Sequence, residues 1–248
     1  MKIAFRKFVS IIGIAVLCIP CSFSQKNNSD LVTSDISVSS FEKIRIEGTV
    51  DVRFHIGDAH RAVLTYNTNL DRDKIEIFSQ NSVLYVKNNN KCNNNDFSLF
   101  NRNSSKKCLV VVDVYCQVLT SVSIFGSGDF KGIDHITSST FAVEVTGAGD
   151  FTGTVKCDNF SAKISGAGDI RISGTSENAD ITVAGAGDFR GRSFDTKNAT
   201  VNINGAGDAR ISVTDNLKAR VSGAGVLTYY GNPKADVSSS GGGNIRKK

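Results

Sequence analysis

The sequence predicts an all-β fold, a parallel β-helix, from a short repeat and from the pattern of apolar residues around it. A Gly-(Ala/Ser)-Gly-Asp tetrapeptide recurs at intervals of 19 to 21 residues, beginning at Gly126, Gly147, Gly166, Gly185 and Gly205. A fixed repeat of this length is typical of a solenoid, in which each repeat forms one coil. Apolar and polar residues alternate before each tetrapeptide, and this period of two indicates strands.

The apolar positions explain why the coils should stack. Val145, Ile164 and Val183 occupy the same place, two residues before successive tetrapeptides. A single coil cannot bury these side chains by itself, so its interior becomes dry only between neighbouring coils. We therefore expect these three residues to lie directly over one another.

The glycines of the tetrapeptides are predicted to form sharp corners between strands. Positive φ and close approach of the neighbouring coil both favour a residue without Cβ. A nucleotide-binding loop is the alternative, but the GxGxxxG spacing misses the dinucleotide fingerprint by one residue, and neither a helix nor a Lys-Ser/Thr pair follows. The predicted structural corners are Gly126, Gly128, Gly147, Gly149, Gly166, Gly168, Gly185, Gly187, Gly205 and Gly207.

The aspartates of the tetrapeptides should form a column along the stack, made of Asp129, Asp150, Asp169, Asp188 and Asp208. Carboxylates one coil apart repel each other by about 1 kcal/mol per pair in water, so something must compensate. One explanation is a weak cation site, because Gly- and Asp-rich β-rolls bind calcium at their turns, although their GGxGxD pattern differs. The other is structural: Asp accepts backbone N–H groups, or pairs with a salt-bridge ladder of basic residues two positions later. Those basic residues are Lys131, Arg171, Arg190 and Arg210.

The N-terminus has the composition of a secretory signal peptide, residues 1–24. Three basic residues precede a short apolar run, and cleavage is expected after Ser24. The run is too short to span a membrane, and Cys18 and Cys21 lack the small preceding residue that lipid attachment needs. The formal net charge of +5 falls to +2 without the three basic residues of this leader. Residues 25–40 are predicted to form a short linker.

Residues 41–248 are predicted to form a single β-helix domain. Residues 123–248 carry the repeats, and residues 41–122 form less regular coils with an Asn-rich insert at 87–107. Because an exposed end coil would add foreign strands, the less regular half is expected to cap one end.

Cysteines enter the prediction in two ways. Cys92 and Cys108 bracket the Asn-rich insert, and in the oxidising setting of an exported protein they are predicted to form a disulfide. Cys116 and Cys157 are predicted to be buried thiols, since two coils, about 10 Å, would separate them. No CxxC pair occurs after the leader, which argues against a zinc site.

Four segments together resemble a known family, over about residues 41–246. In order they are 41–48 (FEKIRIEG), 50–52 (VDV), 84–86 (LYV) and 123–129 (SIFGSGD), followed by the GAGD repeats. They are similar to the putative auto-transporter adhesin, head GIN domain family of exported Bacteroides-type proteins. The resemblance implies a single-stranded right-handed β-helix related in shape to pectin lyases, without recognised catalytic residues, and a role in cell adhesion.

A non-catalytic function is predicted. Catalysis needs one asymmetric cluster, whereas the Asp and Arg columns recur from coil to coil. His55, His60 and His135 stand without a motif, and no GxSxG or HExxH sequence occurs. We expect a cell-adhesion or polysaccharide-binding protein. The alternatives are a structural protein of the periplasmic envelope and, further off, a polysaccharide lyase-like enzyme.

The expected partner is a glycan or a host or cell-surface protein, in the periplasm or at the cell surface. Tyr229 and Tyr230 are an adjacent aromatic pair on which a sugar could stack. Nucleic acid is excluded because basic residues are interleaved with acidic ones and form no patch. No cofactor, resident metal or transmembrane segment is predicted.

Overall fold

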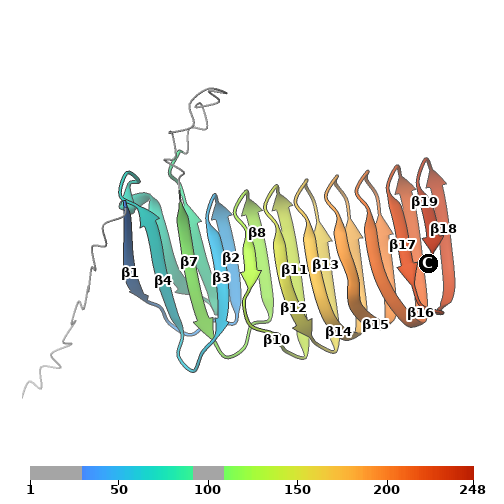
Figure 1. Ribbon diagram of the computed structural model, residues 1–248, viewed down its shortest axis with the longest axis horizontal. Helices are drawn as coiled ribbons and strands as arrows, with labels where there is room; N and C mark the ends of the chain where they lie inside the picture. The colour runs from blue at the N-terminus through green and yellow to red at the C-terminus, as the bar shows by residue number, and fades with distance from the viewer. Residues whose placement is uncertain (1–29, 92–108) are drawn as a thin grey trace, which may run out of the picture.

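The computed structural model describes residues 30–91 and 109–248, which form a β-solenoid of about 7 turns with coils about 19 residues apart (Figure 1). The predicted all-β fold and its repeat are therefore confirmed. The strands are β1 (Leu31–Ser37), β2 (Lys43–Gly48), β3 (Asp51–Ile56), β4 (Arg61–Asn67), β5 (Ile75–Gln80), β6 (Val83–Asn88), β7 (Val110–Cys116), β8 (Ser121–Gly126), β9 (Phe130–Gly132), β10 (Ile136–Thr137), β11 (Thr140–Gly147), β12 (Phe151–Lys156), β13 (Asn159–Ile164), β14 (Ile170–Val183), β15 (Phe189–Ile203), β16 (Ala209–Gly223), β17 (Val226–Tyr230), β18 (Lys234–Gly241) and β19 (Asn244–Lys247). A short 3-10 helix covers Arg72–Lys74.

The strands form two rows along the solenoid. Row A contains the strands that precede the tetrapeptide turns, in the spatial order β5-β6-β2-β8-β11-β13-β14-β15-β16-β18. Row B contains the strands that follow the turns, with β1 and β4 added at its end, in the order β1-β4-β7-β3-β9-β12-β14-β15-β16-β17-β19. The short strand β10 also pairs with β12, next to β9. β14, β15 and β16 run through the corner between the rows and so belong to both.

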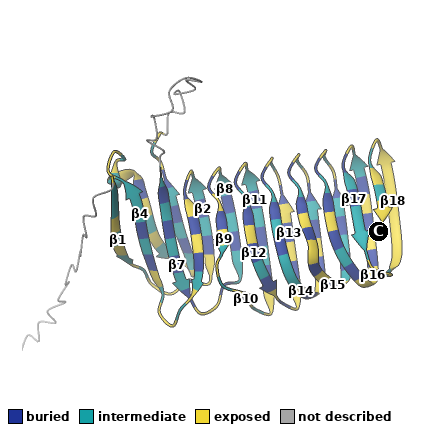
Figure 2. Cartoon of the chain, in the orientation of Figure 1, coloured by how far each residue is buried: buried dark blue, intermediate teal, exposed yellow. Residues whose placement is uncertain are grey.

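The core is a set of apolar columns between the two rows. Val145, Ile164 and Val183 are partners in consecutive parallel pairs, as predicted, and all three are fully buried. In row B, Phe130 and Phe151 are register partners, and their rings stack with centroids 5.1 Å apart. Figure 2 shows the buried positions alternating with exposed ones along the strands. This alternation leaves every second side chain free to form the outer surface.

The coils do not stack in the order of the sequence, which the repeat pattern did not reveal. The coil made of β2 and β3 lies between the β6–β7 coil and the β8–β9 coil, because β2 pairs with both β6 and β8 and β3 pairs with both β7 and β9. The chain therefore begins at the end of the solenoid with β1, passes to an inner coil with β2 and β3, turns back through β4 to β7, and then rejoins the stack at β8.

The end of the solenoid is closed by antiparallel strands. β1 pairs with β4, β4 pairs with β7, and β5 pairs with β6, all antiparallel. Two predictions are corrected here. The stretch 25–40 is not only a linker, because residues 31–37 form β1. The region 41–122 does not consist of coils alone, because β4 and β5 pair with their neighbours in the antiparallel direction. The reversal from β5 to β6 passes through Asn81 and Ser82, which both have positive φ.

The predicted corners are required mainly by the approach of the neighbouring coil. The backbone N–H groups of Ala167 and Gly168 both donate to the carbonyl oxygen of Gly147, at 2.8 and 3.1 Å. A Cβ on Gly168 would overlap the carbonyl oxygen of Gly149. Of the ten predicted corner glycines, only Gly126 and Gly147 have φ in the left-handed region. The expectation of positive φ is therefore wrong for the other eight, where contact with the coil below excludes a side chain.

We expect Gly168→Ala to lower the free energy of unfolding by about 3 kcal/mol, because the new methyl group must displace the backbone of the adjacent coil. Gly132→Ala is the control, since its Cβ would meet no atom nearer than 3.4 Å. Urea unfolding followed by circular dichroism measures both. Equal stability of the two variants would contradict the role given to the corners.

Candidate functional site

The aspartate column is held by hydrogen bonds from one coil to the next. The Oδ1 of Asp129 accepts the backbone N–H of Asp150 at 2.9 Å, and the Oδ1 of Asp150 accepts that of Asp169 at 2.8 Å. The same bond recurs up to Asp208, whose Oδ1 accepts the N–H of Val226 at 2.8 Å. Each carboxylate therefore satisfies a backbone donor of the adjacent coil.

The column also extends one coil further than the tetrapeptides. The Oδ1 of Asp51, in β3, accepts the N–H of Asp129 at 3.1 Å. Sequence analysis missed Asp51 because its coil lacks the GAGD sequence. The signal that could have found it is the similar order of Gly48, Val50 and Asp51.

Two arginines neutralise the middle of the column. Arg171 contacts the Oδ2 atoms of Asp150 and Asp169 at 2.7 and 2.8 Å, and Arg190 contacts those of Asp169 and Asp188, both at 3.1 Å. Each guanidinium bridges two coils. In the described part of the chain, the other two residues of the expected ladder, Lys131 and Arg210, form no ion pair.

Burial opposes ionisation at the edge of this ladder. It raises the pKa of Asp129, and the charges of Asp51 and Asp150 act in the same direction, against the hydrogen bond from the Asp150 N–H. The hydrogen bond to Asp150 raises the pKa of Arg171. Residues 30–91 and 109–248 contain no group of three His, Cys, Asp or Glu residues placed to hold a metal ion. The cation column stays a prediction, and the donors around Asp150, Asp169 and Asp188 already occupy both carboxylate oxygens.

A long groove lies on row A, and we call it the amide groove. Its volume is about 760 Å³, and it crosses seven coils from Thr120 to Asp236. One wall is a ladder of asparagine amides in which each Nδ2 donates to the Oδ1 of the preceding coil, at 2.8 to 3.1 Å. The ladder consists of Asn159, Asn178, Asn198 and Asn216. The sequence analysis missed this ladder, although an Asn recurs there at the same interval as the coils.

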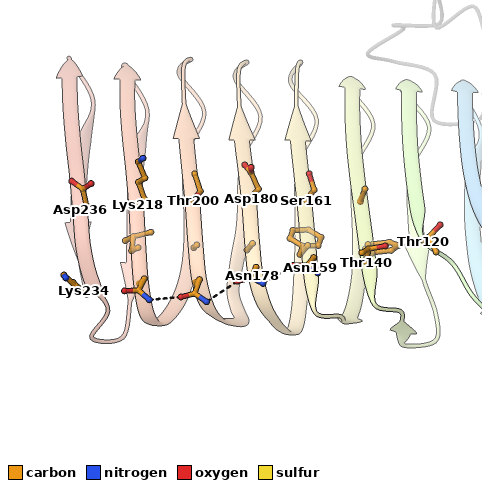
Figure 3. A pocket seen from close by; sticks show the side chains of 18 residues that line it. Thr120, Thr140, Asn159, Ser161, Asn178, Asp180, Thr200, Lys218, Lys234 and Asp236 are labelled. Carbon is orange, nitrogen blue, oxygen red and sulfur yellow. Dashed lines mark hydrogen bonds between the residues drawn. The ribbon is translucent and has the colours of Figure 1, made fainter.

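The second wall of the amide groove is a column of outward side chains, Ser161, Asp180, Thr200, Lys218 and Asp236, which Figure 3 shows running across the strands above the asparagines. Each is the register partner of the next. The two rings that reach the groove, Phe141 and Phe160, are only 1% and 3% exposed. The lining also includes the buried apolar residues Ala179, Ala199 and Leu217, so the groove combines hydrogen-bonding walls with apolar surface and has no open aromatic face.

In the described residues no hydrogen bond or ring contact joins two of the three histidines. The Nε2 of His55 lies 3.0 Å from the Oδ1 of Asp113, and its ring stacks on Tyr115. The Nδ1 of His60 accepts the backbone N–H of Phe41. The His55–Asp113 pair resembles part of a catalytic triad, but within the described residues no Ser or Cys side chain hydrogen-bonds to His55.

The two cysteines in the described residues are buried and therefore unreactive as nucleophiles. Cys116 and Cys157 are free and buried, as predicted. Burial raises the pKa of the Cys116 thiol to about 12 and that of Cys157 to about 11, which keeps both protonated. The predicted Cys92–Cys108 disulfide and the signal peptide lie outside the described residues.

We expect Asp169→Asn to lower the free energy of unfolding at pH 7 by about 1 kcal/mol, because it removes two half-exposed ion pairs but keeps an acceptor for the Asp188 N–H.

Asp129→Asn should change the free energy of unfolding in the opposite direction. A raised pKa in the fold means that the charged carboxylate costs stability above about pH 4. The variant should therefore gain stability at pH 7 and match the parent at pH 3. Urea unfolding at both pH values checks this, and a greater loss in Asp129→Asn than in Asp169→Asn would contradict it.

Solved structures share this fold. A protein from Bacteroides fragilis described as a putative adhesin is 22% identical, with a TM-score of 0.77 over 88% of this chain and 97% of its own. A putative lipid binding protein from Parabacteroides distasonis is 21% identical, with a TM-score of 0.67 over 89% and 98%. A putative adhesin from Parabacteroides merdae is 20% identical, with a TM-score of 0.66 over 89% and 97%. At these identities the likeness shows the fold alone.

No curated protein matches the chain. In residues 30–91 and 109–248, no helix has the length and apolar character needed to cross a bilayer. A sequence model of the family described as putative auto-transporter adhesin, head GIN domain, matches residues 40–233, and the chain therefore belongs to that family.

Proposed function

We propose that this protein is an exported, non-catalytic adhesion module that binds an extended neutral glycan in the amide groove. The observation that carries the proposal is the continuity of that groove across seven coils. At about 4.8 Å per coil, the lining extends over about 29 Å, the length of an extended polymer segment and not of a small metabolite. Solenoids commonly use such long faces for binding.

The chemistry of the lining suits sugar hydroxyl groups. An amide both donates and accepts hydrogen bonds, as a hydroxyl does, and the ladder holds Asn178 and Asn198 in fixed orientations through their neighbours. A fixed polar wall loses little conformational entropy when a ligand binds. The four charges of the lining cancel: Asp180 and Asp236 are balanced by Lys218 and Lys234. A neutral polymer is therefore favoured over a charged one.

The same features support binding without catalysis. The asparagine wall of the groove repeats the same side chain from coil to coil, whereas an active site needs one distinct cluster. The His55–Asp113 pair belongs to β3 and β7, while the groove lining begins at Thr120. One structural neighbour is described as a putative lipid binding protein, but an identity of 21% indicates a shared fold and not a shared ligand.

A glycan array of the purified chain tests this function, and we expect binding to neutral polysaccharides. Thr200→Arg should weaken binding at least about tenfold, because a long cation would obstruct the groove and disturb its charge balance. Thr182→Arg is the matched control: Thr182 is also half-buried in row A but does not line the groove. Circular dichroism melting verifies that both variants fold. Absence of binding to every neutral glycan, or equal loss in both variants, would refute the proposal.

Adhesion also requires that the protein reach the cell exterior, for which the leader-like N-terminus and the family description are the support. Protease treatment of intact cells should remove the protein while a periplasmic marker survives. Full protection until the outer membrane is opened would rule out adhesion and leave a role within the periplasmic envelope.

A further inference from the structure

Row B carries a second groove, which we call the basic groove, with a volume of about 660 Å³. Five cationic side chains line it, namely Arg171, Arg190, Arg192, Arg210 and Lys248. No Asp or Glu side chain belongs to its lining, so the basic residues do gather in a patch here, although they are interleaved with acidic residues in the sequence. It differs from the amide groove both in its place, on the strands that follow the turns, and in its charge.

The cations of the basic groove are not all used by the fold. Arg171 and Arg190 are engaged by the aspartate column at the edge of the groove. Arg192, Arg210 and Lys248 take part in none of the ion pairs found in residues 30–91 and 109–248. Three positive charges therefore face the groove without a carboxylate partner in the described structure.

A β-bulge brings Arg192 to this surface. Arg171 pairs with Arg190 and Ser173 pairs with Ser193, so β15 has one residue more than β14 in this interval. As a result Arg192 and Ser193 are both exposed, where regular alternation would turn one of them inward. The guanidinium of Arg192 lies over the ring of Tyr230, 5.0 Å from its centroid. Bulges of this kind commonly re-aim a side chain at a functional surface, and the cation–π contact holds the guanidinium in place.

We propose that the basic groove binds an acidic polysaccharide, through the carboxylate or sulfate groups along its chain. The three cations without a carboxylate partner follow one another along row B: Arg192 lies on β15, Arg210 on β16 and Lys248 directly after β19, so they are spread over about three coil spacings of 4.8 Å. That row is longer than one isolated anion and suits a polymer that carries several charges. Guanidinium groups bind planar oxyanions in a bidentate manner.

Other groups in the basic groove favour a sugar polymer over another polyanion. Hydroxyl groups from Thr152, Thr154, Ser173 and Ser193 line it beside the arginines, and they match the hydroxyl groups of sugar rings. Tyr230 is a single aromatic side chain, whereas proteins that bind single-stranded nucleic acid use successive aromatic platforms. The glycan is therefore the ligand that the geometry supports.

The test measures binding of the purified chain to polygalacturonate, dextran sulfate, neutral dextran and single-stranded DNA by isothermal titration calorimetry, at low and at high salt. We expect one or both acidic glycans to bind, with affinity falling as salt rises because the contacts are ionic. The carboxylate and sulfate arms identify which anion the groove prefers. Arg192→Ala/Arg210→Ala should lose at least about tenfold in affinity, since each removes a charge-assisted contact.

The matched control is Lys163→Ala/Arg220→Ala, which removes two cations from row A and should change the affinity less than about twofold. Arg171 and Arg190 are left intact because they stabilise the aspartate column. Equal loss in both double variants, no binding to either acidic glycan at low salt, or tighter binding to DNA would overturn the proposal. Because Thr200→Arg lies in the amide groove, its effect on neutral glycans separates failure of one site from failure of the other.

Discussion

The structure depends on one contact, the approach of each glycine corner to the corner of the coil beneath it. At this contact two consecutive N–H groups share one carbonyl oxygen of the preceding coil, as Ala167 and Gly168 do with Gly147. A Cβ on either glycine of a corner, such as Gly166 or Gly168, would occupy the space of the backbone of the preceding coil. The repeat is therefore first a packing requirement. It keeps the coils close enough for parallel pairing, and parallel pairing brings the apolar columns into register.

Close stacking has an electrostatic consequence that the same repeat resolves. It aligns carboxylates from Asp51 to Asp208, and at Asp129 burial, with the like charges of Asp51 and Asp150 acting in the same direction, raises the pKa of the carboxyl group. The next coil supplies a backbone N–H to each carboxylate, and Arg171 and Arg190 supply charge in the middle of the column. Each coil thus completes the hydrogen bonding of its neighbour, which makes the stack interdependent in its polar as well as its apolar contacts.

The outer surface is where the two rows differ in their side-chain chemistry. Both rows use the same alternation of buried and exposed residues, but row A presents amides and balanced charges, whereas row B presents cations beside a tyrosine. Neither groove requires a departure from the fold, apart from the bulge that exposes Arg192. A scaffold whose interior is fixed by its corners can therefore change its outward columns freely, and ligand preference follows from those columns.

The sequence alone determined the strands and corners of the repeats and the alignment of Val145 with Ile164 and Val183, because these are set locally and repeated at one interval. It also located the aspartates and the arginines. It did not show which backbone N–H groups donate to the aspartates, because those groups belong to the adjacent coil. Tertiary structure alone decided that β2 and β3 lie inside the stack and that β4 and β5 run antiparallel. Where repeats are irregular, strand pairing depends on which edges are free when distant segments meet, and no local pattern records this. The two grooves have the same origin, since their walls are built from residues about 20 positions apart that only stacking brings together.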